Sequence, residues 1–563
     1  MKRKGKMLSL MLAGIMVVSM AGCGTSGSGE GAGAPSQGSV QAGTKESVQE
    51  SGTGSSAQTS EAEADARDPF EKYEEPITVR TTMLTKSLKG LKDGVTLENN
   101  AVRDIFAEYG INLQYDIVAD TDEDMTTKIN MAIATNDLPD FLIVNATQFK
   151  DLLDADMLED MTDYIEDYAS DAIKDFLAQV EEDQWKNVQK DGRTYGILSP
   201  NEYDDYVGVV AVRKDWLEEL KLEEPETMED VWSIASAFKE NKMDGTCDIG
   251  VGLTKNVIDF RTPTLFLLNA YHAYYDIWLD QDGQLVNSTI APSMKDALGK
   301  LHEKYEEGLI DPEFGSKDAT KQMEDAVAGR AGVVVTKHTG PFSLLNGVKL
   351  GQDWAYYRIP SDDGQVVKAQ QSVGFTEALV AVKGTKHPEA MLKLMNIFMK
   401  YMTEDPAKYN DDAMNNFAYP FKSFYPNVNN KIHKEYLEYL KTEKWPDSIY
   451  SGFDSTAEAA ELWRKSQDPD GYTMWAVFGP DGTENAVDYA LENDGYLVDK
   501  YTGPVTDNMA KYGANLKTMT EQMVTYIITG QKPVDYFDEF VESWKTNGGD
   551  VITEEVNEWY RNN

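Results

Sequence analysis

The stretch INLQYDIVADTDEDMTTKINMAIATNDLPDFLIVN, residues 111–145, contains the pattern that decides the fold. Its first part places apolar side chains at Ile111, Leu113 and alternate positions beyond, which is typical of a half-buried β-strand. The middle part begins with capping Asp and Thr residues and continues as an amphipathic helix. The last part, FLIVN, is a short apolar run that predicts a buried strand. The stretch therefore reads as a strand, a helix and a second strand.

The residues before this stretch extend the same alternation. ITVRTTM, residues 77–83, predicts another strand. Apolar side chains then recur at helical spacing from Val102 to Tyr109, and Gly110 stands where a helix C-cap belongs. Strand, helix, strand, helix and strand at this spacing predict a parallel sheet with right-handed crossovers.

The end of each predicted strand suggests where a ligand would bind. In open α/β sheets, ligands bind beyond the carboxyl ends of the strands. Thr85, Asn145 and Gln148 follow such ends. We expect these three polar side chains to lie near a ligand site.

Size and charge limit the possible partners. The chain has 563 residues, with 53 Lys and Arg against 96 Asp and Glu, a net charge of −43. The body from about Asp68 to Asn563 is too long for one domain and predicts two lobes. So acidic a surface argues against nucleic acid and against direct contact with anionic lipid. We therefore expect no nucleic-acid partner.

The N-terminus has the features of an export signal. Lys2 to Lys6 make a basic start, and the apolar run Met7–Ala21 is too short to span a bilayer but suits a signal peptide of residues 1–22. Met20-Ala21-Gly22-Cys23 resembles a bacterial lipobox, with Met where Leu is usual. That resemblance implies that Cys23 carries palmitate and other lipid as the first residue of the mature protein. The alternative is an ordinary signal peptide with an incidental cysteine.

Residues 23–67 are expected to form the lipid anchor and a disordered linker. They are mostly Gly, Ser, Ala, Gln, Thr and Glu, and such a composition cannot bury enough apolar surface to fold. About 50 flexible residues have a root-mean-square reach of roughly 40 Å. The sequence thus predicts a folded body tethered to the outer face of the cytoplasmic membrane through its lipid anchor only.

Five blocks span nearly the whole body in order. The blocks are LPDFLIVNATQFKDLLDADMLEDMTDYI (138–165), YGILSPNEYDDYVGVVAVRKDWLEELKLEEPETMEDVWSIASAFKE (195–240), YEEGLIDPEFGSKDATKQMEDAVAGRAGVVV (305–335), VAVKGTKHPEAMLKLMNIF (380–398) and IITGQKPVDYFDEFVESWKTNGGDVITEEVNEWY (527–560). Together they resemble bacterial extracellular solute-binding proteins of the family 1 type, which are receptor subunits of ABC importers. The last block is close to the ending of the LplA-like lipoprotein branch.

The resemblance implies a fold and a function. The fold is the α/β, two-lobe, type II periplasmic-binding-protein-like fold, with mainly parallel sheets flanked by helices and a ligand cleft between the lobes. Members of known function mostly bind oligosaccharides or sugar derivatives, so the implied partners are an oligosaccharide and ABC transporter permease subunits. We expect a monomer. A ligand sensor that uses the same fold remains an alternative.

The expected lobes are discontinuous in sequence, because the chain crosses between them near 198–206 and near 373–376. Lobe 1 would contain residues 68–205 plus 375–430. Lobe 2 would contain residues 206–374 plus 431–563. Closure of such lobes on a ligand would give a state that a partner can sense.

Aromatic side chains provide further candidates for ligand contact, because sugar rings present C–H faces that pack on aromatic rings while their hydroxyls need polar partners. Each candidate is chosen for a place at a predicted crossing, turn or strand end, or, for Trp278, just before a predicted hairpin turn at Asp282-Gly283. The alternative for each is a packed core or lobe-surface residue. The candidates are Tyr203, Trp278, His338, Phe342, Trp354, Tyr357 and Trp475.

Metal binding has one candidate loop, residues 240–253. The resemblance implies a calcium loop there in some alginate-type relatives, but Lys242 and Ile249 fall on ligand positions and are poor replacements for oxygen donors. We expect no cofactor and no calcium. Only Cys247 remains after Cys23, so we also expect no intrachain disulfide in the mature protein.

Catalysis has little support in the sequence. The five histidines form no H-E-x-x-H pair, and there is no G-x-S-x-G motif or P-loop. A tethered glycoside hydrolase remains an alternative, since it needs only two suitably spaced carboxylates. With 96 acidic residues, candidate pairs carry no information. We expect a binding protein rather than an enzyme.

Overall fold

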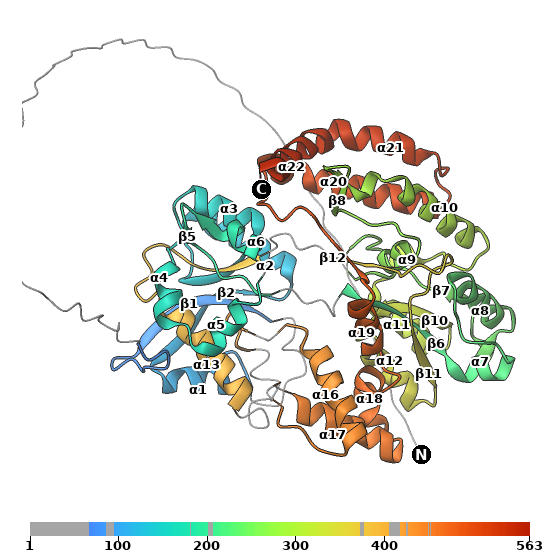
Figure 1. The fold of residues 1–563 in the computed structure, drawn as a ribbon, viewed down its shortest axis with the longest axis horizontal. Coiled ribbons are helices and arrows are strands. Elements are labelled where there is room, and N and C mark those ends of the chain that lie inside the picture. The colour runs from blue at the N-terminus through green and yellow to red at the C-terminus, as the bar shows by residue number, and fades with distance from the viewer. Residues whose placement is uncertain are drawn as a thin grey trace, which may run out of the picture. The chain divides into compact units, whose positions relative to one another are not determined.

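The computed structural model describes residues 67–85, 95–180, 182–200, 206–259, 261–371, 377–404, 417–423, 426–448, 450 and 452–562 (Figure 1). The predictions for the signal peptide, Cys23, most of the linker and Tyr203 lie outside the described residues. So do most of the two expected crossings. Residues Asp65–Asn563 form one compact unit.

The first strands and helices follow the predicted order. β1 (Ile77–Leu84) pairs in parallel with β2 (Ile111–Ala119), and α1 (Ala101–Glu108) connects them. α2 (Asp122–Thr135) then leads to β3 (Phe141–Asn145). These elements form where predicted because alternating and helical apolar patterns each bury one face.

Caps fix the ends of these helices. The side chain of Asn100 accepts a hydrogen bond from the backbone N–H of Arg103 at the start of α1. Thr121 does the same for α2 through the N–H of Asp124. Gly110, which follows α1, has φ of +77°, in the region that favours glycine. The predicted C-cap is confirmed.

A second segment completes this part of the molecule. β13 (Glu377–Ala381) pairs with β3, and α13 (Ala390–Glu404) packs against α4 and α5. The other short elements here are α3 (Ala146–Asp154), α4 (Thr162–Tyr168), α5 (Asp171–Leu177), α6 (Glu182–Trp185), β4 (Gln189–Lys190) and β5 (Arg193–Thr194).

A four-stranded sheet organises the next part, in the order β11-β6-β10-β7. Its strands are β6 (Gly208–Arg213), β7 (Ile249–Val251), β10 (Ala331–Lys337) and β11 (Trp354–Arg358). The accompanying helices are α7 (Lys214–Leu220), α8 (Met228–Glu240), α9 (Pro263–Ala270), α10 (Pro292–Glu306), α11 (Ala319–Val327) and α12 (Pro341–Lys349).

A β-hairpin with a two-residue loop follows α9 in the chain. β8 (Trp278–Gln281) and β9 (Gln284–Asn287) pair antiparallel around Asp282 and Gly283. Both turn residues have positive φ, +56° and +83°, as a tight hairpin with the strand twist requires. The predicted turn is confirmed. A further pair, β12 (Ala369–Gln371) and β14 (Tyr496–Val498), is parallel.

Helices dominate the C-terminal residues. α10 packs on α20, which in turn contacts α21 and α22, and these helices lie together in Figure 1. The helices are α16 (Val428–Thr442), α17 (Phe453–Ser466), α18 (Tyr472–Phe478), α19 (Glu484–Glu492), α20 (Asp507–Ile528), α21 (Tyr536–Trp544) and α22 (Asp550–Asn562). Within the described residues, none of the helices is both long enough and apolar enough to cross a membrane.

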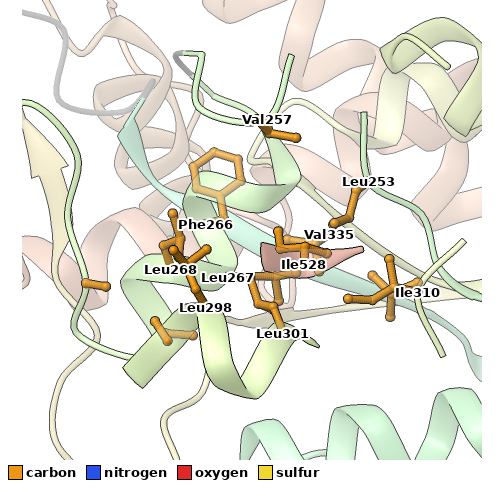
Figure 2. Packing of buried hydrophobic residues seen from close by; sticks show 14 of the residues in the cluster. Leu253, Val257, Phe266, Leu267, Leu268, Leu298, Leu301, Ile310, Val335 and Ile528 are labelled. Atoms are coloured by element: carbon orange, nitrogen blue, oxygen red, sulfur yellow. The ribbon is translucent and has the colours of Figure 1, made fainter. Parts of the chain in front are cut away.

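The buried apolar residues fall into two groups of segments. Two clusters use only residues from 79–198 and 378–421, and the others use residues from 207–369 and 432–556. In the largest cluster, side chains of α9 and α10 meet β10 and Ile528 of α20 (Figure 2). The lobe boundaries near 205 and 375 stay a prediction, and this division of the core agrees with them.

The sheets are mixed rather than mainly parallel, which corrects one detail of the expected fold. β1–β2, β10–β7 and β12–β14 are parallel, while β3–β13, β6–β10 and β6–β11 are antiparallel. A parallel neighbour usually comes from a crossover connection. Along the sequence, β13 comes after all the strands of the β11-β6-β10-β7 sheet. The chain between β3 and β13 therefore contains a whole further sheet and is not a single crossover connection.

Candidate ligand-binding site

Asn145 and Gln148 form a capping box at the start of α3. The Asn145 side chain accepts a hydrogen bond from the Gln148 N–H at 2.9 Å, and the Gln148 Oε1 accepts one from the Asn145 N–H at 3.1 Å. Gln148 Nε2 also donates to the Thr126 carbonyl and to Asn130 Oδ1. Gln148 is only 3% exposed, so this side chain holds α3 in place and has no free group for a ligand.

Thr85 lies where expected, directly after β1. Its hydroxyl donates to the Ala119 carbonyl at 3.1 Å and contacts the Asp120 carboxylate. The residue is half-buried. Within the described residues, Thr85 and Gln148 make no hydrogen bond to each other.

Trp354 and Tyr357 lie on β11. Trp354 is 4% exposed, packs with Ala211 and Leu344, and donates its indole N–H to Gln352 at 3.1 Å. Tyr357 is half-buried, and its pKa is raised mainly by this burial and further by the negative charge of the nearby Glu224. Trp354 is therefore placed as a core residue, because the strand turns its ring into the packed face.

Trp475 lies inside α18, a helix that the turn signals flanking this tryptophan did not predict. Gly471 precedes the helix and Gly479 ends it, so the turn residues mark helix boundaries. Its ring packs against the cluster that contains Tyr436 and Phe453. A helix places this tryptophan on a packed face.

His338 and Phe342 follow the carboxyl end of β10, as expected, but they face different environments. His338 is fully buried, with Nε2 3.6 Å from a carboxylate oxygen of Glu484. Phe342, on α12, is 45% exposed. Of this pair, only Phe342 is accessible to a ligand.

Trp278 is the predicted tryptophan that lines a cavity. The cavity has a volume of about 270 Å³, near the lower end of the roughly 300–1,000 Å³ of small-molecule sites. Its wall comes from the 275–289 region, from residues 499–520 and from the C-terminal helices near Trp544. Figure 1 shows β8 close to α20, the two elements that face each other here. Segments more than 200 residues apart in sequence therefore meet at one recess. Its lining residues all belong to the expected lobe 2, so the recess does not span the expected cleft between the lobes.

Asp499 supports one wall of this cavity. Its Oδ1 accepts hydrogen bonds from the backbone N–H groups of Trp278 and Tyr501, both at 2.9 Å. Only 6% of the residue is exposed, and burial raises the pKa of Asp499 to about 7. The described part of the chain gives its Oδ2 no hydrogen-bond donor, while Asp499 itself lines the cavity.

Asp276 supplies a second carboxylate. Its backbone φ is +52°, its N–H donates to the Thr289 hydroxyl, and Asn287 Nδ2 donates to its Oδ1 at 3.3 Å. The residue is exposed to solvent along part of its surface, but its carboxyl group is surrounded by protein atoms. This burial raises the pKa of Asp276, while the hydrogen bond from Asn287 and the charge of Lys517 act to lower it. Such a combination is expected of a carboxylate in a recess that water can enter.

Aromatic rings complete the wall. The backbone of Tyr275 is fixed from both sides by Gln370, which accepts from its N–H at 2.8 Å and donates to its carbonyl at 2.7 Å. Tyr501 packs edge-on against Trp559, with ring centroids 4.9 Å apart. Rings held in this way offer apolar surface at low entropic cost.

The sequence predictions named Trp278 but missed Asp276, Asp499, Tyr275 and Tyr501. Asp276 and Tyr275 lie within three residues of Trp278, so the hairpin could have pointed to them. Nothing in the sequence around Asp499 distinguishes it from the other members of the 96 acidic residues. The cavity brings together carboxylates and rings, which can accept hydroxyl hydrogen bonds and cover the apolar face of a small ligand.

The loop at 240–253 holds its carboxylates against arginines. Arg330 makes two 3.0 Å contacts with Asp248, and Arg213 lies 3.1 Å from Asp244. Among the described residues, no group of three or more His, Cys, Asp or Glu side chains could hold a metal ion.

Comparison with known proteins identifies the family. Residues 90–409 match the sequence model of the bacterial extracellular solute-binding protein family. Lipoprotein LipO of Bacillus subtilis (strain 168) is 22% identical over 462 residues, 78% of this chain and 85% of that protein. The polygalacturonan/rhamnogalacturonan-binding protein YtcQ of the same organism is 23% identical over 478 residues, 82% of this chain and 88% of that protein.

Solved structures confirm the fold class. An extracellular solute-binding protein from Bifidobacterium longum subsp. infantis superposes with a TM-score of 0.61 at 15% identity, covering 86% of this chain and 98% of that one. The two-lobe α/β fold expected from the sequence is thus present. The chain belongs to the bacterial extracellular solute-binding protein family.

Proposed function

We propose that this protein is the substrate-binding receptor of an ABC importer and that it binds an oligosaccharide or sugar derivative, tethered to the membrane through lipid on Cys23. Family membership supports the receptor role. The name of YtcQ, a relative described as binding polygalacturonan and rhamnogalacturonan, supports a saccharide as ligand. The lipobox-like sequence before Cys23 supports the tether.

The observation that carries the proposal is the cavity beside Trp278. It combines ring surface from Tyr275 and Tyr501 with the carboxylates of Asp276 and Asp499. A ring covered on one face contributes on the order of 2 kcal/mol at about 25 cal/mol per Å². The carboxylates supply the fixed polar partners that sugar hydroxyls need. The cavity suits a small ligand or one residue of a longer saccharide.

The experiment is a thermal-shift screen of residues 65–563 against oligosaccharides, followed by calorimetry on each ligand found. A ligand at 100 times its Kd adds about 2.7 kcal/mol to stability. We expect Asp276→Asn to weaken binding about tenfold, because it removes a charged acceptor from the cavity.

Asp282→Asn is the matched control. Asp282 is also exposed, also has positive φ, and lies in the same hairpin region but outside the cavity wall. We expect its affinity to stay within about twofold of the wild type. Equal affinity in both variants would contradict the assignment of the cavity.

The glycoside hydrolase alternative is tested on the same samples. We expect mass spectrometry to recover every bound saccharide unchanged after prolonged incubation. Cleaved product that disappears in Asp276→Asn and Asp499→Asn would instead establish an enzyme. Loss of saccharide uptake in cells that lack the protein would separate an importer receptor from a sensor.

A further inference from the structure

We infer that a second recess, at the carboxyl end of β11, binds the carboxylate of an acidic sugar through Arg358. The inference rests on the proposed function and narrows its ligand class to saccharides that carry a uronate unit. The wall of this Arg358 recess is separate from the wall of the cavity beside Trp278.

The Arg358 recess lies at one edge of the four-stranded sheet. Arg358 is the last residue of β11 and pairs with Val209 near the amino end of the antiparallel β6. The recess has a volume of about 120 Å³, and its wall includes Gly208, Arg358, the residues that follow β11 and part of α19. Ligands of open α/β sheets bind beyond the carboxyl ends of strands. So small a recess suits one end of a ligand rather than a whole oligosaccharide.

The strands β12 and β14 separate this recess from the cavity beside Trp278. Ala369, which begins β12, and Gly495, which precedes β14, line the Arg358 recess. Asp499, which follows β14, lines the other cavity. At about 3.3 Å per residue along a strand, Gly495 and Asp499 lie about 13 Å apart. A substitution at Arg358 therefore leaves the wall of the Trp278 cavity unchanged.

The guanidinium group of Arg358 is oriented but not occupied. Its central carbon lies 4.4 Å from the centroid of the Tyr489 ring. Stacking of this kind restrains the group and leaves the N–H donors at its edge available. Within the described part of the chain, no carboxylate forms an ion pair with Arg358, although the residue lines the recess. A guanidinium fork binds a carboxylate best, through two parallel charge-assisted hydrogen bonds.

Asn269 supplies a second, independent group for the ligand. This residue of α9 lines the recess and is only 3% exposed. Its Nδ2 donates to the Ala273 carbonyl at 3.2 Å and to Gln370 Oε1 at 3.5 Å, while none of the described residues donates to its Oδ1. A buried carbonyl oxygen calls for a donor, and a ligand hydroxyl is one. A sugar acid carries both the carboxylate for Arg358 and the hydroxyl for Asn269.

Two further charged side chains line the recess. Lys368 is already matched, because its Nζ donates to Asp494 at 2.6 Å. Glu226 is exposed and, among the described residues, makes no ion pair with Arg358. Its charge opposes an anionic ligand, but only across solvent that screens it, whereas Arg358 acts at contact distance. Removing Arg358 and removing Glu226 should therefore change uronate affinity in opposite directions.

The test compares uronate trisaccharides with their neutral parents. Calorimetry on residues 65–563 would use trimers of galacturonate, glucuronate, mannuronate and guluronate, each beside the trimer that has an alcohol at C6. We expect at least one uronate to bind about tenfold more tightly than its parent. Arg358→Gln should abolish this preference and leave the affinity for the neutral parent within about twofold. Glu226→Gln should tighten uronate binding about twofold or more, and more so at low salt.

Arg561→Gln is the matched control, since this arginine is exposed at the end of α22 and lies outside the recess. We expect it to keep the full preference for the uronate. If Arg358→Gln lowers the melting temperature of the free protein, the opposite change expected of Glu226→Gln decides the question.

The outcomes separate this inference from the proposed function. Neutral parents that bind as tightly as every uronate overturn the inference and leave a saccharide receptor in place. A uronate preference that survives in folded Arg358→Gln, or that Glu226→Gln weakens, also overturns it. If none of these sugars binds, and the broader screen finds no saccharide either, the proposed function itself fails.

Discussion

Asp499 links the stability of the cavity wall to pH. Its carboxyl group has a pKa of about 7 in the folded protein because it is buried, against about 3.9 in an unfolded chain. The folded state therefore binds this proton more tightly than the unfolded state. Stability from this group is greatest at low pH and falls as pH rises from about 4 through about 7.

Asp499→Asn should remove this dependence while keeping the Oδ1 acceptor for Trp278 and Tyr501. We expect the free energy of unfolding of the variant, minus that of the wild type, to increase by about 1 kcal/mol per pH unit between roughly pH 4.5 and 6.5. Urea unfolding at several pH values measures it. A difference that is constant with pH would mean that Asp499 does not titrate in this range.

We expect Arg330 to neutralise a carboxylate of the 240–253 loop in the place of a metal ion. It pairs with Asp248 through two nitrogens and donates to the buried Asp325. We expect Arg330→Gln to reduce stability by about 1 kcal/mol or less, because exposed Asp248 loses its bidentate partner while buried Asp325 keeps its ion pair with Lys317. Arg561→Gln, at the exposed end of α22, should have no measurable effect.

Chelation tests the same loop without mutation. The melting temperature of the wild type should be equal in calcium and in EDTA, because guanidinium groups already neutralise the loop carboxylates. A clear fall in EDTA would show that the loop binds calcium despite Lys242.

Single residues show the limit of prediction from the sequence. Trp278, Trp354 and Trp475 all stand near turn signals and all three pack in apolar clusters, but among them Trp278 also lines the cavity. Sequence spacing cannot tell which face of a strand or helix meets a partner far away in the chain. Asp499 reaches Trp278 across 221 residues, so only the folded structure reveals the pair.

At the scale of elements, α3 depends on its capping box. Asn145→Ala removes the acceptor for the Gln148 N–H, and we expect a loss of about 1 kcal/mol in unfolding free energy. Ligand affinity should not change, since these side chains bond to each other rather than to a ligand. A normal stability together with weakened binding would restore Asn145 to the ligand site.

Most elements were predictable because their patterns are local. The alternation in 111–118, the helical spacing of 102–109 and the Asp282-Gly283 turn each appear as expected. α18 was missed because its bounding glycines resemble turn signals in a helix of only seven residues. The direction of β13 was not predictable, because it depends on a return of the chain from a distant segment.

The whole molecule is expected to be held at the membrane by its first mature residue. Cys23→Ala should leave the protein unprocessed or release it to the medium, because no lipid can then be attached. Cys247→Ala is the control, since that thiol is buried in the folded body. Cell fractionation measures both variants. Normal processing and full membrane retention of Cys23→Ala would contradict the lipid anchor.

The most direct test of the account is a crystal structure of residues 65–563 with the tightest-binding oligosaccharide found in the screen. We predict that one sugar ring occupies the cavity beside Trp278, with a hydroxyl within hydrogen-bond distance of Asp499 Oδ2 and another near Asp276. A saccharide bound elsewhere, with this cavity holding only water, would contradict the account.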